Sequence, residues 1–280
     1  MFKEGKWAKQ ILLQQRSDGG WGYFHSLARP QMGELTTEQA LRRLSRLGFT
    51  MEDEPIARAV QYLEDCLLHR ICTPDRVEKT HDWEIGTQMM FAAWIRHFKK
   101  ENKHANHVAH CWAQVIHEAF ISGEYSETHY LRGFLQMFGK PPKGPRLLDF
   151  VHFYVVSLIA EELDAPTESA VFDYILQKQS GIYYIYNHPL ETLPANFASK
   201  QTSYYLATAE VLSAYPRSHA KMQFVIEWLE KNRNARGKWD LGAEANDGVY
   251  FPLSEHWRTN ENREHDCTYR IEKLLSKLKL

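Results

Sequence analysis

A loose internal repeat of helical segments constrains the fold of this chain more than any other feature. Two sets of segments alternate strictly, and successive starts within one set lie roughly 50 to 60 residues apart, which is typical of arrays built from helix pairs. The first set begins near Lys6, Pro55, Ala105, Thr167 and His219, and the second covers residues 36–47, 84–98, 147–163, 201–214 and 266–278. This alternation predicts an all-α fold with outer and inner helices.

Single segments carry the signals of helix starts and ends. Residues 36–47 space their leucines three apart with arginines between them, which is the periodicity of an amphipathic helix. Thr36 and Gln39 resemble an N-terminal cap, and Gly48 is typical of a helix stop. Pro55 suits the first turn of the next helix. The one alternating run, residues 182–186, is too short to found a sheet.

The repeat also predicts the domain organisation. A Pro/Gly-rich linker covers residues 139–145, but the repeat resumes beyond it with the same period. Because neighbouring helix pairs in an array share their buried faces, one core would run through the chain. We therefore predict a single domain, residues 1–280, in which about five to six helix pairs close into an α/α toroid.

Charge and cysteine content limit the functional classes. Lys and Arg number 34 against 35 Asp and Glu, so a net charge of −1 gives no general attraction to nucleic acid. The longest apolar stretch, around residues 151–160, is too short to span a bilayer. Four cysteines without a CxxC pair favour reduced thiols. A cytoplasmic protein with no transmembrane segment is therefore the expectation, and its oligomeric state is left open.

A short motif recurs where three of the outer helices end. Glycine permits a left-handed turn out of a helix, an aromatic ring can pack over that turn, and an amide can bond the exposed carbonyls. This chemistry predicts a structural role for the motif. It occurs as Gln15-x3-Gly19-x-Trp21, as Gln177-x3-Gly181-x-Tyr183, and in a version where Asn232 replaces the Gln, one residue is inserted and Gly237-x-Trp239 follows.

The motif resembles the QW repeat of squalene–hopene and oxidosqualene cyclases and the related repeat of protein prenyltransferase β subunits. The resemblance implies an α/α toroid around a central cavity, with an apolar, isoprenoid-like small molecule as ligand. It also implies that the starts of the inner helices line one mouth of the cavity. The cavity or ligand-binding residues implied at these starts are His81, Trp83, Gln201, Tyr204, Tyr205 and Tyr269.

The same resemblance points to two candidate acids. Asp266 opens an Asp-Cys-Thr run similar to the start of the Asp-Cys-Thr-Ala-Glu motif, in which the Asp of oxidosqualene cyclases is the initiating acid. Asp82 occupies another helix start. The match ends at Tyr269 and Arg270, and an arginine beside the acid favours its ionised form rather than a proton donor. The alternative is that both acids cap helices and the tyrosines are core.

No cofactor is expected from the sequence. Prenyltransferase β subunits hold zinc with an Asp-x-Cys pair and a distant His, whereas the pairs here, Asp65-Cys66 and Asp266-Cys267, are adjacent. Adjacent residues on a helix point about 100° apart, which does not suit one metal ion.

Two other functional classes remain open. One is a non-catalytic toroid that serves as a ligand- or protein-binding scaffold. The other is a carbohydrate-active α/α barrel enzyme, in which two carboxylates share acid/base work and aromatic rings stack on sugars. The residues available for it are Asp82, Glu84 and Asp247, with Trp83 and Trp257 for stacking.

Overall fold

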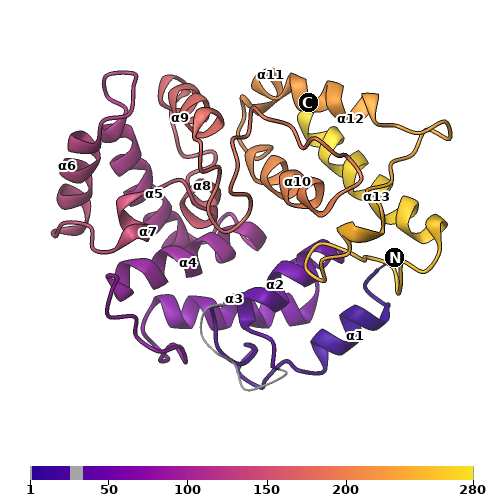
Figure 1. The fold of residues 1–280 in the computed structure, drawn as a ribbon. Coiled ribbons are helices and arrows are strands. Elements are labelled where there is room, and N and C mark those ends of the chain that lie inside the picture. The colour runs from indigo at the N-terminus through magenta and orange to yellow at the C-terminus, as the bar shows by residue number, and fades with distance from the viewer. Residues whose placement is uncertain (1, 26–33, 280) are drawn as a thin grey trace. The chain divides into compact units, whose positions relative to one another are not determined.

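The computed structural model describes residues 2–25 and 34–279, and this part of the chain is all-helical (Figure 1). It holds thirteen α-helices and one short 3-10 helix, with only two isolated β-bridges and no strand. The predicted all-α class is confirmed. Close contacts divide the chain into a first unit, Met1–Ala109 with Leu253–Glu255, and a second unit, His110–Pro252 with His256–Leu280. Each unit is described by itself, and the single toroidal domain stays a prediction.

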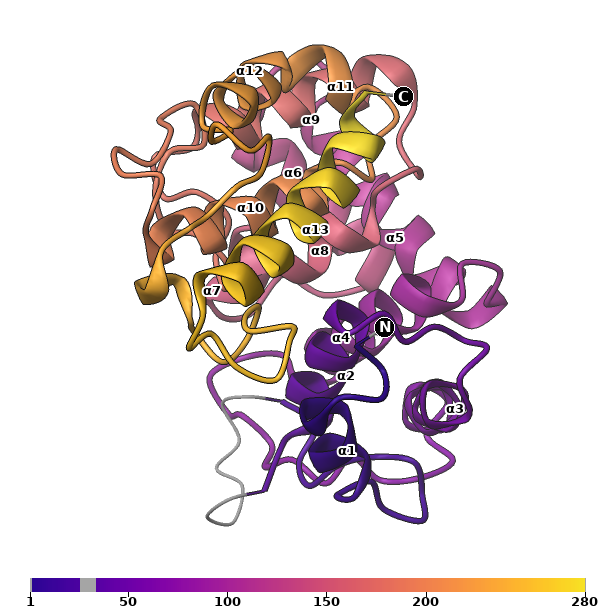
Figure 2. The same ribbon diagram turned by 90° about the vertical axis from the view of Figure 1, so that its right-hand side faces the viewer.

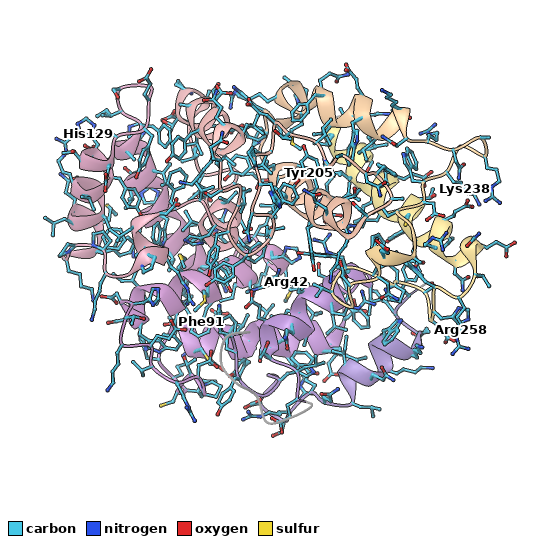
Figure 3. The ribbon with its side chains drawn as sticks, in the orientation of Figure 1. Arg42, Phe91, His129, Tyr205, Lys238 and Arg258 are labelled. Carbon is cyan, nitrogen blue, oxygen red and sulfur yellow. The ribbon has the colours of Figure 1, made fainter. Side chains whose placement is uncertain are left out.

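The first unit is built around the helices α1 to α4 and the beginning of α5. Helix α1 packs against α2, α2 packs against α3, and α3 lies along α4. The buried Phe24 ring meets Phe91, labelled in Figure 3, edge to face, with ring centroids 4.7 Å apart. The helix bounds are α1 Lys6–Leu12, α2 Thr37–Arg46, α3 Glu54–Leu67, α4 Trp83–Phe98 and α5 Lys103–Ala119.

The predicted start and stop signals of the first unit are confirmed. The Thr36 side chain accepts the Gln39 N–H at 3.2 Å, and the Gln39 side chain accepts the Thr36 N–H at 3.1 Å, which is a complete capping box. Gly48 adopts φ +92° directly after the helix. Pro55 lies in the first turn of α3, where its missing N–H leaves no hydrogen bond unmade.

The second unit centres on α10, which packs against α8, the 3-10 helix η1 and α13. Helix α13 also contacts α11 and α12, and Figure 2 shows it running across α10. The bounds are α6 Glu127–Phe138, α7 Pro145–Leu148, α8 Phe153–Leu158, α9 Ala165–Gln177, α10 Lys200–Leu212, α11 Ser218–Lys221, α12 Gln223–Lys231, η1 Ala243–Ala245 and α13 Asn260–Leu278.

Two predicted boundaries in the second unit are wrong. The helix predicted at residues 147–163 is two short helices, α7 and α8, because the chain between them pairs with Tyr183. The last helix begins at Asn260 rather than near Asp266, and the Thr259 side chain caps it by accepting the Asn262 N–H. Its first turns are polar and show no apolar periodicity, so Asp266 lies inside the helix and is not an N-cap.

Candidate functional site

The tryptophan of the first motif fastens the end of α1 to the start of α2. The Trp21 ring is fully buried, as its predicted structural role requires, and its indole Nε1 donates to the Ile11 carbonyl at 2.8 Å. The Trp21 N–H donates to Thr37 Oγ1, and that hydroxyl donates back to the Trp21 carbonyl, both at 2.8 Å. We call this arrangement, from Ile11 to Trp21 with Thr37, the first corner.

Gln15 and Gly19 attach the first corner to α3. Gln15 Nε2 donates to the Gly19 carbonyl at 2.9 Å and to the Pro55 carbonyl at 2.8 Å, so one amide links the turn to α3. Gly19 has φ +94°, and a Cβ there would lie 2.5 Å from the Arg58 carbonyl oxygen. The motif therefore needs glycine both for the backbone conformation and for this close approach.

The second unit contains the same corner, from Leu229 to Trp239 with Thr268. The Trp239 ring is fully buried, and its Nε1 donates to the Leu229 carbonyl at 2.6 Å, while its N–H donates to Thr268 Oγ1 at 3.1 Å. In both corners the indole reaches back ten residues. We call this arrangement the second corner.

The second corner has no inserted residue, so the predicted alignment through Asn232 is wrong. The turn bond from Arg16 N–H to the Gly20 carbonyl, 2.9 Å, is matched by that from Asn234 N–H to the Lys238 carbonyl, 2.8 Å. Arg233 consequently stands where Gln15 stands in the first corner. Its guanidinium carbon lies 4.5 Å from the centroid of the Trp239 ring, which is a cation–π contact.

The middle copy of the motif keeps the glycine turn without the packed ring. Gly181 has φ +61°, and a Cβ there would lie 2.2 Å from the Tyr186 carbonyl oxygen. The Tyr183 ring is 50% exposed and Gln177 is exposed as well, so the packing role predicted for this pair is wrong. The Tyr183 backbone instead pairs with residues 151–153.

Asp75 holds the chain that follows the first corner. Its carboxylate accepts the Phe24 N–H at 2.5 Å and the His25 N–H at 2.8 Å. Burial is the largest influence on this carboxyl and raises its pKa to about 6, with Glu38 and Glu78 adding to the increase. This buried clamp has no motif in the sequence and was not predicted.

The predicted site residues of the first unit form the start of α4. The Asp82 side chain accepts the Ile85 N–H at 3.2 Å, so this candidate acid caps the helix. His81 Nδ1 lies 2.9 Å from the hydroxyl of Thr80 and 3.2 Å from Glu78 Oε2. Trp83 is the first residue of α4 and is partly buried.

Three further predicted residues lie in the first half of α10. Gln201 Nε2 donates to the Tyr186 hydroxyl at 3.2 Å, and the Tyr205 hydroxyl donates to the Leu190 carbonyl at 2.8 Å. Tyr205, labelled in Figure 3, is buried, and desolvation raises its pKa. The Tyr204 ring lies edge to face with Tyr250 at 5.9 Å.

Asp266 is fully buried on α13, beside the Trp257 ring. Its Oδ2 accepts the Trp257 indole N–H at 2.8 Å, and its Oδ1 lies 3.4 Å from His265 Nδ1. The Trp257 ring is in turn packed on Phe251, with centroids 4.8 Å apart. Tyr269 follows on the same helix and is partly exposed. We call Trp257 and Phe251, with the carboxyl group of Asp266 bonded to the first of these rings, the aromatic shell.

Sequence reasoning missed the ionic network beside this shell. Arg270 is buried and donates through Nε and Nη2 to the two carboxylate oxygens of Glu210, at 2.8 and 3.2 Å. Its Nη1 donates to Ser203 Oγ at 3.0 Å, and Ser203 Oγ donates to Asp247 Oδ2 at 3.0 Å. The paired carboxylate of Arg270 is therefore Glu210. The only sequence signal was an arginine on the apolar face of the last helix.

His152 is another of the buried titratable groups in this unit, and only 2% of it is exposed. Its Nε2 lies 2.9 Å from the Arg146 carbonyl, and its backbone pairs with Tyr183. Burial lowers the pKa of its imidazole to about 4.

The described residues do not assemble a metal site. Across residues 2–25 and 34–279, no group of three or more His, Cys, Asp or Glu side chains could hold a metal ion. Within the same residues, no helix combines the length and apolarity needed to cross a membrane. Comparison with protein-family models, with curated proteins and with solved structures gives no match.

Proposed function

We propose that this chain is a helical-repeat protein of the terpenoid cyclase and prenyltransferase type that binds an isoprenoid-like or other lipid-like ligand. The observation that carries the proposal is the pair of corners. Trp21 and Trp239 are both buried, both donate the indole N–H to a carbonyl ten residues earlier, and both donate the backbone N–H to the hydroxyl of a helical threonine. A motif that recurs with its hydrogen bonds supports a repeat architecture more strongly than a spacing alone.

The aromatic shell of Asp266 is the part of the second unit best suited to such a ligand. Small-molecule sites are mostly apolar, with a few polar groups that fix orientation. Trp257 and Phe251 supply apolar surface, and Asp266 is the polar group among them. Tyr204 and Tyr250 extend the aromatic surface toward α10.

Binding is better supported than acid catalysis. An indole N–H only donates, so the Asp266 oxygen that faces Trp257 serves as a hydrogen-bond acceptor. The second candidate acid, Asp82, caps α4 and lies in the first unit. In this proposal Asp266 orients the Trp257 ring, and neither Asp266 nor Asp82 acts as a proton donor.

A protein-binding scaffold is the second candidate function. It is favoured by the way polar side chains near the helix starts are engaged within their own unit: Asp82 with the Ile85 N–H, Gln201 with the Tyr186 hydroxyl and Tyr205 with the Leu190 carbonyl. A scaffold needs such groups only for stability.

A ligand panel tests the proposal on the full chain. Farnesyl diphosphate, farnesol, squalene and a cello-oligosaccharide would be titrated, with thermal shift, tryptophan fluorescence and product analysis as readouts. We expect saturable binding of an isoprenoid without turnover, weakened by Trp257→Phe and unchanged by the matched control Trp112→Phe, which changes a buried ring on α5. Absence of binding by every isoprenoid would leave the scaffold function, and binding of the oligosaccharide alone would favour the carbohydrate-active alternative.

A further inference from the structure

The tautomer of His152 is fixed by its hydrogen bond. A backbone carbonyl only accepts, so the Nε2 that lies 2.9 Å from the Arg146 oxygen must carry the hydrogen. The lowered pKa, about 4, keeps the ring neutral at pH 7. Nδ1 is therefore a lone-pair acceptor, held at the start of α8.

This acceptor lies inside the protein. Nδ1 receives no hydrogen bond from any of the described residues, and only 2% of the His152 side chain is exposed. Buried polar atoms are almost always paired, and each exception calls for an explanation. An acceptor in this position is suited to a guest that donates an O–H or N–H group.

The surroundings of His152 are aromatic. Its ring lies 6.0 Å from the Tyr154 ring, and the Tyr154 ring lies 5.4 Å from that of Tyr184. The Arg146 guanidinium stacks over the Tyr184 ring at 5.6 Å. A guest held by Nδ1 would therefore rest its carbon skeleton against rings, which suits an apolar tail.

The turn at residues 181–186 covers this place and is strained. The Phe153 N–H donates to the Tyr183 carbonyl at 3.1 Å, which lays the turn over the start of α8. Tyr184 adopts φ +74°, a left-handed conformation that a non-glycine residue rarely takes. Strain of this kind is often stored where a segment must move, so the turn is the part that yields to a guest.

The charges nearby do not suit a diphosphate. A diphosphate head group is normally held by several cations or by a bound metal ion. Lys178 Nζ lies 2.9 Å from Asp149 Oδ2, so that cation is already paired, and Arg146 is stacked on Tyr184. No metal cluster exists among the described side chains. A neutral donor fits this charge balance better.

We propose that His152 Nδ1 accepts a hydrogen bond from the hydroxyl group of a neutral isoprenoid alcohol, and that this contact selects the alcohol over the diphosphate. The inference rests on the proposed function, because the isoprenoid class comes from there. It takes only the ligand class from that proposal and adds a head-group contact at His152, whose neighbours Tyr154 and Tyr184 are not the residues of the Asp266 and Trp257 site.

Two variants separate the two nitrogens of His152. His152→Gln keeps an N–H at the Nε2 position for the Arg146 carbonyl and removes the Nδ1 acceptor. His152→Asn keeps an acceptor at the Nδ1 position and removes the donor. We expect the full-length wild type to bind farnesol about tenfold more tightly than farnesene or farnesyl diphosphate, as one buried hydrogen bond allows. His152→Gln should lose this preference and His152→Asn should keep it.

Nitrogen NMR of histidine-labelled wild-type protein supplies a readout that needs no variant. The Nδ1 resonance of His152 should move when farnesol is added and stay in place with farnesene. Equal binding of farnesol and farnesene, or an unmoved Nδ1 resonance at saturation, would overturn the inference while leaving isoprenoid binding intact. If no isoprenoid binds at all, the inference and the proposed function fall together.

Discussion

The first and second corners share the hydrogen bonds of the tryptophan indole and backbone N–H groups but differ in what lies against them. In each, a glycine turn brings a buried tryptophan back to the helix that precedes it, α1 or α12, and onto a threonine of α2 or α13. In the first corner, Gln15 also bonds the Pro55 carbonyl of α3. In the second, Arg233 takes that position and stacks on Trp239. The hydrogen bonds of the tryptophan stabilise the turn in both corners. The contacts of Gln15 and Arg233 differ because each depends on what packs beside that corner.

The largest expected effect comes from breaking the shared part. Because Trp21 and Trp239 are fully buried and each donates its indole N–H to a carbonyl ten residues earlier, replacing either with Ala should lower the free energy of unfolding by about 3–5 kcal/mol. Urea unfolding followed by circular dichroism measures this, and partly buried Trp83→Ala is the control with a smaller loss. If Trp21→Ala and Trp83→Ala lowered the free energy of unfolding by similar amounts, the first corner would contribute no special stability.

Acid should act on the two units in opposite directions, with the larger effect in the second. Burial lowers the pKa of His152 to about 4 in the folded protein, against a usual 6.5. The free energy of unfolding is therefore unaffected by this group above pH 6.5 and falls by about 3 kcal/mol as pH drops toward 4. Asp75 titrates at about 6 against 3.8, so folding gains stability as pH falls from 6 to 3.8, by about 2 kcal/mol after allowing for its partial exposure.

Stability measured against pH for two variants separates these contributions. His152→Gln should flatten the acid loss, because glutamine does not titrate, and Asp75→Asn should remove the acid gain. Local hydrogen exchange at the start of α8 and in residues 22–25 assigns each change to its unit. If His152→Gln left the slope between pH 6.5 and 4 as steep as in the wild type, the burial argument for this imidazole would fail.

Local signals in the sequence predicted much of the fold. The capping box of Thr36 and Gln39, the stop at Gly48 and the start at Pro55 all act within a few residues, and all are present. Residues 147–163 break because they pair with Tyr183, a partner that is distant in the sequence. The early start of α13 was missed for another reason: Thr259 caps first turns that are polar and show no apolar periodicity.

The candidate site was less predictable for the same reason. Asp266 was identified from a short motif, yet its partner Trp257 and the ion pair of Arg270 with Glu210 depend on the tertiary fold. The clamp of Asp75 on backbone N–H groups leaves no pattern in the sequence at all. Aromatic content predicted apolar surroundings but not which rings would meet.

The smallest effect, and the sharpest test of the difference between the corners, lies in their glycines. Gly19 and Gly237 both adopt left-handed backbone, with φ +94° and +73°, so alanine at either position should cost about 1–2 kcal/mol through the backbone alone. At Gly19 the new Cβ would also lie 2.5 Å from the Arg58 carbonyl oxygen, a backbone atom of α3 that cannot rotate away. At Gly237 it would meet nothing within 4 Å.

Gly19→Ala should therefore be less stable than Gly237→Ala by about 1–3 kcal/mol, which is the usual cost of overpacking against fixed atoms. Paired urea titrations of the two variants measure that difference directly. If both variants lost the same free energy of unfolding, α3 would be free to shift away from the new Cβ, and the close contact between the first corner and α3 would not be a rigid one.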